Sequence, residues 1–369
     1  MLARAGFRVT LLEQAERLDE IGAGIQLSPN ATRILIALGL GERLRRDASI
    51  PQAVAIKTAE GRPLARIPLG TEAERRYGAP YWSIHRGDLQ AALVEAVEAE
   101  PAITLRLGTR VEDFTVQGRR VVAAGHEGMA LIGADGLWSA LRTRLGHRAQ
   151  PQFQHRTAWR ATVPADAVEP AFRAAEAQLW LGRDAHLVHY PVKAGTQINM
   201  VAIVTDRWAE PGWSAAGRRD ELLARYAGWS QAARRFLALP THWQKWALHD
   251  LSPLPRWSDG PVTLLGDAAH PMLPFLAQGA AMAIEDAAVL AQSLLRHPDD
   301  AATAMRRYEQ ARRHRTTRVQ REARSNGRVY HAGAGAALRN LVLRLTGGNL
   351  MLRRYDWLYD ERLTPPDGR

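Results

Sequence analysis

The chain has 369 residues, of which 46% are hydrophobic and 24% are charged, a balance typical of a globular protein large enough for two lobes. A cysteine count of 0 excludes disulfides, thiolate nucleophiles and cysteine-ligated metals. No apolar run approaches the length of about 18 residues that a membrane span needs, and no export signal is visible, so we expect a cytoplasmic protein.

Arginine carries nearly all of the net charge of +11, because lysine occurs only at positions 57, 193 and 245. The densest basic run is ARRHRTTRVQREARSNGR, residues 311–328, in which Arg315, Arg318 and Arg321 recur at helical spacing. It has no interleaved aromatic residue on which a base could stack. We therefore interpret it as a solvated helix face and expect no nucleic-acid partner; a nucleic-acid binder remains an alternative hypothesis.

The first third of the chain alternates predicted strands and helices. FRVTLLE predicts a strand, and SPNATRILIALGL predicts a helix that begins with Ser28 and Pro29 and ends at Gly39. HRGDLQAALVEAVEAE predicts a second helix, AITLRLGTRVEDFTVQGRRVVAAG predicts short strands, and MALIGADGLWSALRTRLG predicts a strand, an acidic turn and a helix. This order indicates an α/β nucleotide-binding lobe over residues 1–48 and 82–153.

The middle of the chain has a different pattern. AQLWLG, AHLVHYPV and TQINMVAIVT alternate like strands of an antiparallel sheet. We assign residues 49–81 and 154–250 to an inserted lobe that binds the substrate. Residues 251–297 return to the nucleotide-binding lobe, and residues 298–369 form a predicted C-terminal helical region.

The stretch GDAAHPMLPFLAQGAAMAIEDAA, residues 266–288, follows an apolar run and ends in a helix-like pattern. Asp267 can accept a hydrogen bond from a ribitol or ribose hydroxyl, and the helix that begins at Gly279 and Ala280 presents unpaired amides that favour an electron-rich partner. Gly279 has no side chain to hold a flat ring away. From these residues alone, the pattern is equally consistent with a surface for a flat ring such as an isoalloxazine and with ordinary loop packing.

Glu13 ends the first predicted strand, where a doubly wound Rossmann-like fold places the carboxylate that binds a ribose. The glycine fingerprint of that fold should lie about 20 residues before this acid, but Glu13 is only the thirteenth residue. We therefore expect the first strand and its GxGxxG loop to be missing, which leaves a gap in the parallel sheet and removes the backbone amides that would bind a pyrophosphate. Either the true start lies upstream of Met1, which we favour, or the chain is a degenerate remnant.

Seven motifs follow one another over essentially the whole chain: VTLLEQ, GAGIQLSPNATRIL, HRGDLQAAL, LIGADGLWSALR, YPV, GDAAHPMLPFLAQGAAMAIEDA and RYDWLY. In these motifs the chain resembles the single-component FAD-dependent aromatic-ring monooxygenases, the group of salicylate and 3-hydroxybenzoate hydroxylases. The resemblance implies an α/β fold with a Rossmann-like FAD-binding lobe, an inserted antiparallel-sheet substrate lobe and C-terminal helices.

The resemblance also implies a set of FAD contacts. In order along the cofactor, these are Val111 by the adenine, Glu13 at the adenosine ribose, Arg86 near the diphosphate, Asp267 at the ribityl or pyrophosphate part, and Gly279 with Ala280 behind the flavin. Asp135 and Gly136 match an Asp-Gly motif implicated in binding FAD and the reduced nicotinamide.

The implied reaction uses NADH or NADPH to reduce FAD, and O₂ then forms a C4a-hydroperoxide that hydroxylates a phenol-type ring. Because a phenol attacks best as phenolate, we predict a base near the ring and select His189; a hydrogen-bonded structural histidine is the alternative. Gln278 either orients the substrate hydroxyl or caps the helix. Arg160 is the candidate partner of a substrate carboxylate, and no residue pattern suggests a metal.

The leading hypothesis is therefore hydroxylation of a hydroxybenzoate- or salicylate-like substrate by an FAD-dependent monomer or homodimer. The alternative is a truncated, noncatalytic flavoprotein remnant or interaction protein. A flavin halogenase is disfavoured because no WxWxIP-like stretch occurs.

Overall fold

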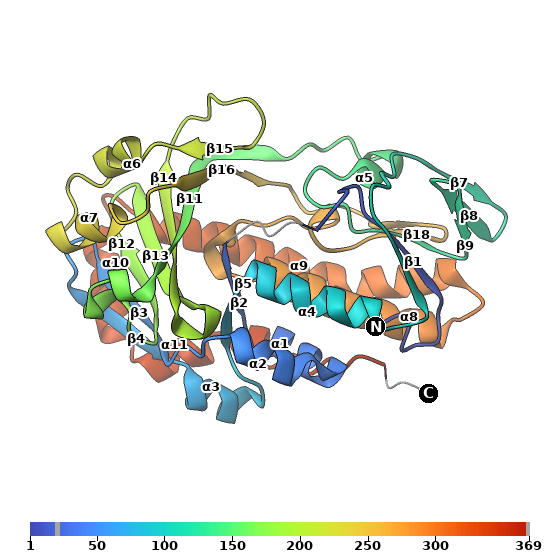
Figure 1. Ribbon diagram of the computed structural model, residues 1–369, viewed down its shortest axis with the longest axis horizontal. Helices are drawn as coiled ribbons and strands as arrows, with labels where there is room; N and C mark the ends of the chain where they lie inside the picture. Colours follow the sequence, from blue (N-terminus) through green and yellow to red (C-terminus); the bar gives the residue numbers. More distant parts are fainter. Residues whose placement is uncertain (19–22, 367–369) are drawn as a thin grey trace.

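The computed structural model describes residues 1–18 and 23–366, so Gly22, the first residue of the GAGIQLSPNATRIL motif, lies outside the described residues. Figure 1 shows a large sheet in one lobe, short parallel strands in the other, and the long helix α9 (Ala301–Tyr330) extending across both. Met305 near the start of α9 packs into the core of the first lobe, and Val319 packs against the sheet of the second. α9 therefore connects the two lobes.

The first lobe contains two short sheets that each include one parallel pair of strands. In one, β1 (Val9–Leu12) pairs with β6 (Ile103–Arg106). In the other, β10 (Leu131–Gly133) pairs with β18 (Val262–Leu264), and β18 also pairs antiparallel with β17 (Ser258–Asp259). Within the described residues, the two sheets share no strand.

Two further sheets complete the strands of this lobe. β2 (Gly24–Leu27) pairs antiparallel with β5 (Trp82–His85), and β7 (Phe114–Gln117), β8 (Arg120–Ala123) and β9 (His126–Gly128) form a meander. The helices are α1 (Pro29–Leu35), α2 (Gly41–Asp47), α4 (Arg86–Glu98), α5 (Ala140–Arg144) and α8 (Gly279–Arg296).

The helix expected to end at Gly39 is interrupted earlier. α1 ends at Leu35, a π-helical turn covers Ile36–Leu40, and Gly39 has a φ of +80°. Glycine adopts this left-handed conformation without a Cβ penalty, and α2 begins two residues later.

The second lobe is built on one eight-stranded sheet in the order β15-β16-β11-β14-β13-β12-β3-β4. Its strands are β3 (Ala53–Thr58), β4 (Pro63–Pro68), β11 (Gln152–Pro164), β12 (Ala177–Leu181), β13 (Ala185–Val192), β14 (Gln197–Thr205), β15 (Ser214–Gly217) and β16 (Trp243–Asp250). The expected antiparallel arrangement is confirmed for every neighbouring pair except β12 and β3, which run parallel.

Each face of this sheet is covered by a different set of helices. α6 (Arg219–Arg225) and α7 (Gln231–Leu237) cover one face, where Leu187, Met200 and Phe236 belong to the same core cluster. The other face holds the cluster of Leu179 and Val319, with α3 (Gly70–Tyr77), α10 (Ala336–Leu345), α11 (Gly348–Arg353) and α12 (Asp356–Tyr359) nearby. Because successive residues of a strand point to opposite faces, the choice of face decides which side chains reach a ligand.

The basic run in α9 is not simply a solvated face, and that prediction was wrong for Arg315. Its guanidinium binds Glu285, and Arg312 beside it is 2% exposed. Arg318 stacks over Trp357 at 3.7 Å, while Arg321 is exposed. The sequence could not reveal this, because the acidic partner of Arg315 lies 30 residues earlier, on α8.

Candidate active site

A cavity of about 630 Å³ lies between the two lobes. The first lobe contributes Arg86, Gly136, Asp267, Gly279 and Ala280 to its wall, the sheet of the second lobe contributes Arg160, His186 and Tyr190, and the C-terminal region contributes Tyr330, Tyr355 and Tyr359. The structure therefore brings five of the eight predicted FAD contacts into one cavity with the predicted carboxylate partner, Arg160.

Asp267 enters the cavity wall from a tight turn after β18. Gly266 has a φ of +61°, which a glycine adopts readily, and residues Gly266–Ala268 form a 3₁₀ turn. The Asp267 side chain is exposed at the cavity surface, and partial desolvation by the surrounding protein raises the pKa of its carboxyl. The site thus holds a partly desolvated carboxyl, a group suited to a ligand hydroxyl.

The first turn of α8 forms the adjoining wall. The first bond within the helix runs from the Met282 amide to the Gln278 carbonyl at 2.9 Å, so the helix itself does not use the amides of residues 279–281. A Cβ added at Gly279 would meet only Met272 Cγ, at 3.9 Å. A flat ligand can therefore approach the backbone here, at the positive end of the helix dipole.

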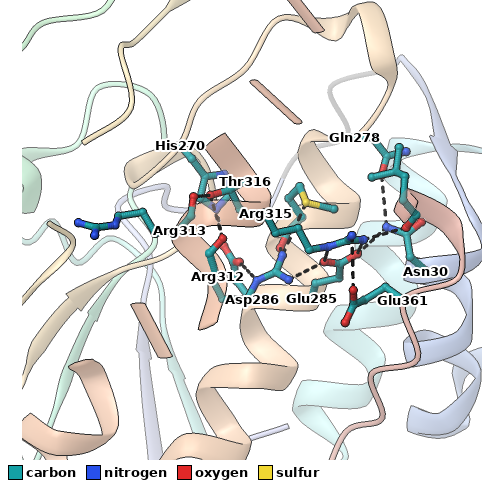
Figure 2. Close-up of polar contacts among 12 residues, drawn as sticks. Asn30, His270, Gln278, Glu285, Asp286, Arg312, Arg313, Arg315, Thr316 and Glu361 are labelled. Atoms are coloured by element: carbon teal, nitrogen blue, oxygen red, sulfur yellow. Dashed lines mark hydrogen bonds and ion pairs between the residues drawn. The ribbon is translucent and has the colours of Figure 1, made fainter. Parts of the chain in front are cut away.

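Behind α8 lies a set of buried charges that we call the ionic cluster: Glu285, Asp286, Arg312, Arg315 and His270 (Figure 2). Arg312 contacts Glu285 at 2.6 Å and Asp286 at 2.7 Å, and Arg315 contacts Glu285 at 2.8 Å. His270 Nε2 lies 2.5 Å from Asp286. His270 and Arg312 hold the pKa of Asp286 down to about 2 although burial opposes this shift, so the carboxylate is charged at neutral pH.

The ionic cluster also fixes the turn and the helix start that face the cavity. Asp286 accepts a hydrogen bond from the Gly266 amide at 3.1 Å, next to Asp267. Asn30 of α1 donates to Glu285 at 2.6 Å and to Gln278 Oε1 at 3.3 Å, as Figure 2 shows. Sequence reasoning missed Glu285 and Asp286, whose signal was an acidic pair inside an otherwise apolar helix.

Gln278 lies at the N-terminus of α8 and lines the cavity, but its side chain already has partners. Its amide nitrogen donates to Ser28 Oγ at 2.8 Å, and its amide oxygen accepts the bond from Asn30. The side chain does not cap α8. Gln278 therefore joins α8 to α1 at the cavity edge.

The histidine selected as a base, His189, does not line the cavity. His186, Val188 and Tyr190 line it, whereas Leu187 and His189 point to the opposite face of β13, as the two-residue alternation of a strand requires. His189 Nε2 accepts a hydrogen bond from Trp180 Nε1 at 3.2 Å, and burial lowers the pKa of His189 to about 3. It is a core histidine, and the histidine in the cavity is His186.

Arg160 on β11 lies in the cavity wall with its guanidinium 5.3 Å from the Trp246 ring. Among residues 1–18 and 23–366, no acceptor contacts its buried Nε atom. Burial lowers its pKa, which reflects the cost of keeping a cation there without a carboxylate. Such a site can bind a ligand anion.

Glu13, Val111 and Asp135 do not line this cavity. Glu13 directly follows β1 and accepts a hydrogen bond from the Ala15 amide at 2.8 Å, and Val111 packs at the edge of the first-lobe core. Asp135 accepts a hydrogen bond from the Leu141 amide in the first turn of α5, at 3.1 Å. Their proposed roles at the adenosine end and in nucleotide binding stay predictions.

The described ranges hold no group of three or more potential metal ligands. Among the helices described, none has both the length and the apolar character required to traverse a bilayer.

Comparisons with known proteins identify the family to which the chain belongs. The family described as FAD binding domain matches residues 1–323. A 3-hydroxybenzoate 6-hydroxylase from Aquipseudomonas alcaligenes is 38% identical, covering 97% of this chain and 92% of the relative. A 3-amino-4-hydroxybenzoate 2-monooxygenase from Streptomyces platensis is also 38% identical, covering 100% of this chain and 93% of the relative. A salicylate hydroxylase in a substrate complex superposes with a TM-score of 0.81 at 28% identity, covering 96% of both chains.

Proposed function

The chain belongs to the FAD binding domain family, and from this premise we propose that it is an FAD-dependent monooxygenase that hydroxylates an aromatic acid carrying a ring hydroxyl, with NADH or NADPH and O₂ as co-substrates. The noncatalytic alternative is not favoured, because the similarity to hydroxylases extends over 97% of the chain or more.

The chemistry of the cavity wall supports binding of the flavin part of FAD. The open backbone at Gly279 and the amides of residues 279–281 suit the edge of a flat ring that becomes electron-rich on reduction. Asp267 and Arg86 supply a carboxyl and a guanidinium for the hydroxyl-bearing and anionic parts. When bound, FAD supplies the redox chemistry, taking two electrons from the nicotinamide and delivering one oxygen atom of O₂ to the ring.

Arg160 is the observation that supports an acid as substrate. The Arg160 side chain lies in the cavity wall, and its buried Nε lacks an acceptor among the described residues. A substrate carboxylate satisfies this cation with charge-assisted hydrogen bonds. Tyr190, whose pKa burial raises, lines the same wall and stays a neutral hydroxyl donor there.

His186 takes the place of His189 beside the substrate hydroxyl. It lies on the same face of β13 as Tyr190, four residues away, and in the same cavity wall as Arg160. An aromatic substrate whose carboxylate binds Arg160 can therefore place its phenol oxygen near His186, which lies in the same wall. Gln278 remains at the α8 edge as a positioning group.

The test uses the purified chain supplied with FAD. We expect FAD binding, and we expect 3-hydroxybenzoate to accelerate oxidation of NADH or NADPH and to yield a dihydroxylated product. The matched control is 3-hydroxybenzamide, which keeps the ring and hydroxyl but lacks the negative charge, and we expect a much weaker effect from it. Protein that binds FAD but responds to no hydroxybenzoate or salicylate contradicts the proposal.

A further inference from the structure

His186 is the cavity-facing member of a series of three hydrogen-bonded, nitrogen-containing side chains that leads away from the cavity. Its Nδ1 lies 2.6 Å from Nε2 of His331, and the Nε of Arg156 donates to Nδ1 of His331 at 3.2 Å. We call Arg156, His331 and His186 the histidine chain. His331 is 8% exposed and His186 is 1% exposed.

Both rings of the histidine chain are neutral at physiological pH. Burial, together with the nearby Arg156, lowers the pKa of His331 to about 3, and burial with His331 lowers the pKa of His186 well below its usual range. Each neutral ring carries one proton, so each ring has one donor nitrogen and one acceptor nitrogen.

The direction of every hydrogen bond in the chain follows from Arg156. A guanidinium only donates, so Nδ1 of His331 must be an acceptor and the His331 proton must lie on Nε2. That proton is donated to Nδ1 of His186, which leaves the His186 proton on Nε2. We propose that Arg156 and His331 are positioning residues that hold His186 in its Nε2–H tautomer, so that His186 donates a hydrogen bond into the cavity and does not take a proton from the substrate.

A bulge in β11 and contacts of its guanidinium position Arg156 beside His331. The pairing of β11 with β16 is irregular between Phe153 and Thr157, and His155 has a φ of +52°, so Arg156 lies at a bulge that redirects the strand. Its guanidinium donates to the Gly327 carbonyl at 3.3 Å and lies 5.5 Å from the Phe275 ring.

Close packing limits the orientation of the His186 ring. Phe275 and Tyr330 lie edge-on to it, at 5.4 and 5.3 Å between ring centres. Gly327 permits the approach of Phe275, because a Cβ at Gly327 would be 2.6 Å from that ring. With its Nδ1 bound by His331, His186 has only Nε2 left for a ligand.

The consequence for catalysis rests on the proposed function. A donor at His186 stabilises a phenolate oxygen more than a phenol oxygen, so the substrate binds preferentially as the phenolate, with its proton left in the solvent. His186 then raises the share of the nucleophilic form by hydrogen bonding and not as a general base. The tautomer itself requires neither FAD nor substrate.

The chain contains a matched internal standard for the tautomer. His189 is three residues away on the same strand, and its Nε2 accepts a hydrogen bond from Trp180. Its proton must therefore lie on Nδ1. The two histidines of one strand are expected to have opposite tautomers.

Nitrogen-15 spectra of histidine-labelled protein test this directly, because protonated and unprotonated ring nitrogens have well separated shifts. We expect an Nε2–H ring for His186 and an Nδ1–H ring for His189, each identified by its loss in His186→Gln or His189→Gln. A His186 ring with its proton on Nδ1 overturns the proposal. Absence of FAD binding or turnover refutes the proposed function and leaves this measurement unaffected.

Arg156→Met keeps the aliphatic packing and removes the donor. We expect His186 to change from one tautomer to a mixture of both, whereas Arg183→Met, at an exposed arginine of the same lobe, leaves it unchanged. In the FAD-loaded protein, the phenolate-to-phenol ratio of bound 3-hydroxybenzoate, read from its ultraviolet absorbance, should fall about tenfold in Arg156→Met. An unchanged His186 tautomer in Arg156→Met overturns the role of Arg156.

Discussion

The two walls of the cavity both contain buried polar groups, but they satisfy them in different ways. Behind the α8 wall, the ionic cluster pairs two carboxylates with two guanidiniums and adds His270. The sheet wall contains His186, whose neutral ring contacts the neutral ring of His331 and, through it, Arg156. It also contains Arg160, whose Nε has no acceptor among the described residues.

The polar groups behind the α8 wall stabilise the backbone of that wall. Those of the sheet wall remain available to bind a ligand. Every carboxylate of the ionic cluster has a partner within the protein, so the cluster gains nothing from a ligand and instead fixes the Gly266 turn and α8. The sheet wall presents a cation and a hydrogen-bond donor with capacity left for a ligand. The first is where we expect FAD to rest, and the second is where we expect the substrate acid to bind.

The largest effect should come from breaking the ionic cluster. Arg312→Met leaves Glu285 and Asp286 buried with fewer counter-charges, and we expect a loss of about 3–5 kcal/mol in the free energy of unfolding. The neighbouring Arg313→Met is the control, because the Arg313 side chain is 45% exposed and, among the described residues, forms an ion pair only with Glu309. It should cost at most about 0.5 kcal/mol in urea unfolding. Equal losses of unfolding free energy in Arg312→Met and Arg313→Met would show that the ionic cluster does not stabilise the α8 wall.

A smaller effect is expected at the binding wall. Arg160→Met removes the cation that faces the substrate, and loss of a charge-assisted hydrogen bond of about 1.5–3 kcal/mol raises KM for 3-hydroxybenzoate by roughly tenfold to a hundredfold. KM for 3-hydroxybenzamide should hardly change, because that ligand has no negative charge. Equal increases for both ligands would show that Arg160 supports the fold and does not bind the carboxylate.

The α8 wall offers a test that separates cofactor contact from stability. Gly279→Ala adds a Cβ whose nearest protein neighbour is Met272 Cγ at 3.9 Å, so the free energy of unfolding without FAD should change by less than about 1 kcal/mol. We expect FAD affinity, measured by quenching of flavin fluorescence, to fall about tenfold, equivalent to about 1.4 kcal/mol. Unchanged affinity would place the flavin elsewhere.

The contributions of His331 and Asp286 to the free energy of unfolding should change with pH in different ranges. The pKa of His331 is about 3 in the folded chain and 6.5 in a free histidine, so its contribution to stability is fully present above pH 6.5 and declines below it by about 1.4 kcal/mol per pH unit. Asp286, with a pKa lowered from 3.8 to about 2, contributes above pH 3.8 and loses that contribution as the pH falls toward 2.

Unfolding of His331→Phe and of the unsubstituted chain should therefore be compared at pH 7 and pH 5. Relative to that of the unsubstituted chain, the free energy of unfolding of His331→Phe should be about 2 kcal/mol higher at pH 5 than at pH 7. A difference that is the same at both pH values would indicate that the His331 pKa is not lowered by burial.

Local patterns predicted much of the fold. Strand and helix periodicity indicated the α/β lobe and the antiparallel sheet, and the small residues around Gly279 indicated a helix start with open backbone. The partners of α9 could not be predicted, since Arg312 and Arg315 look like neighbouring solvated arginines until α8 is packed against them. Pairing across 30 residues depends on tertiary packing, which periodicity does not contain.

The histidine assignment shows the same limit on a smaller scale. The alternation of β13 groups His186 with Tyr190 and separates them from His189, which was visible in AHLVHYPV. Both faces of this strand are buried, however, so the sequence could not tell which face borders the cavity. In the structure, α6 and α7 cover the face that carries His189, so the face that carries His186 borders the cavity.

The proposed function requires transfer of one oxygen atom to a phenolic acid bound in this cavity. The most direct measurement is turnover of 3-hydroxybenzoate with FAD and NADH or NADPH under ¹⁸O₂, followed by mass spectrometry of the product. We expect one labelled oxygen atom in each hydroxylated product molecule, and loss of this product in Arg160→Met at substrate concentrations below KM. Nicotinamide oxidation that yields only hydrogen peroxide, or a hydroxyl group derived from water, would contradict the account.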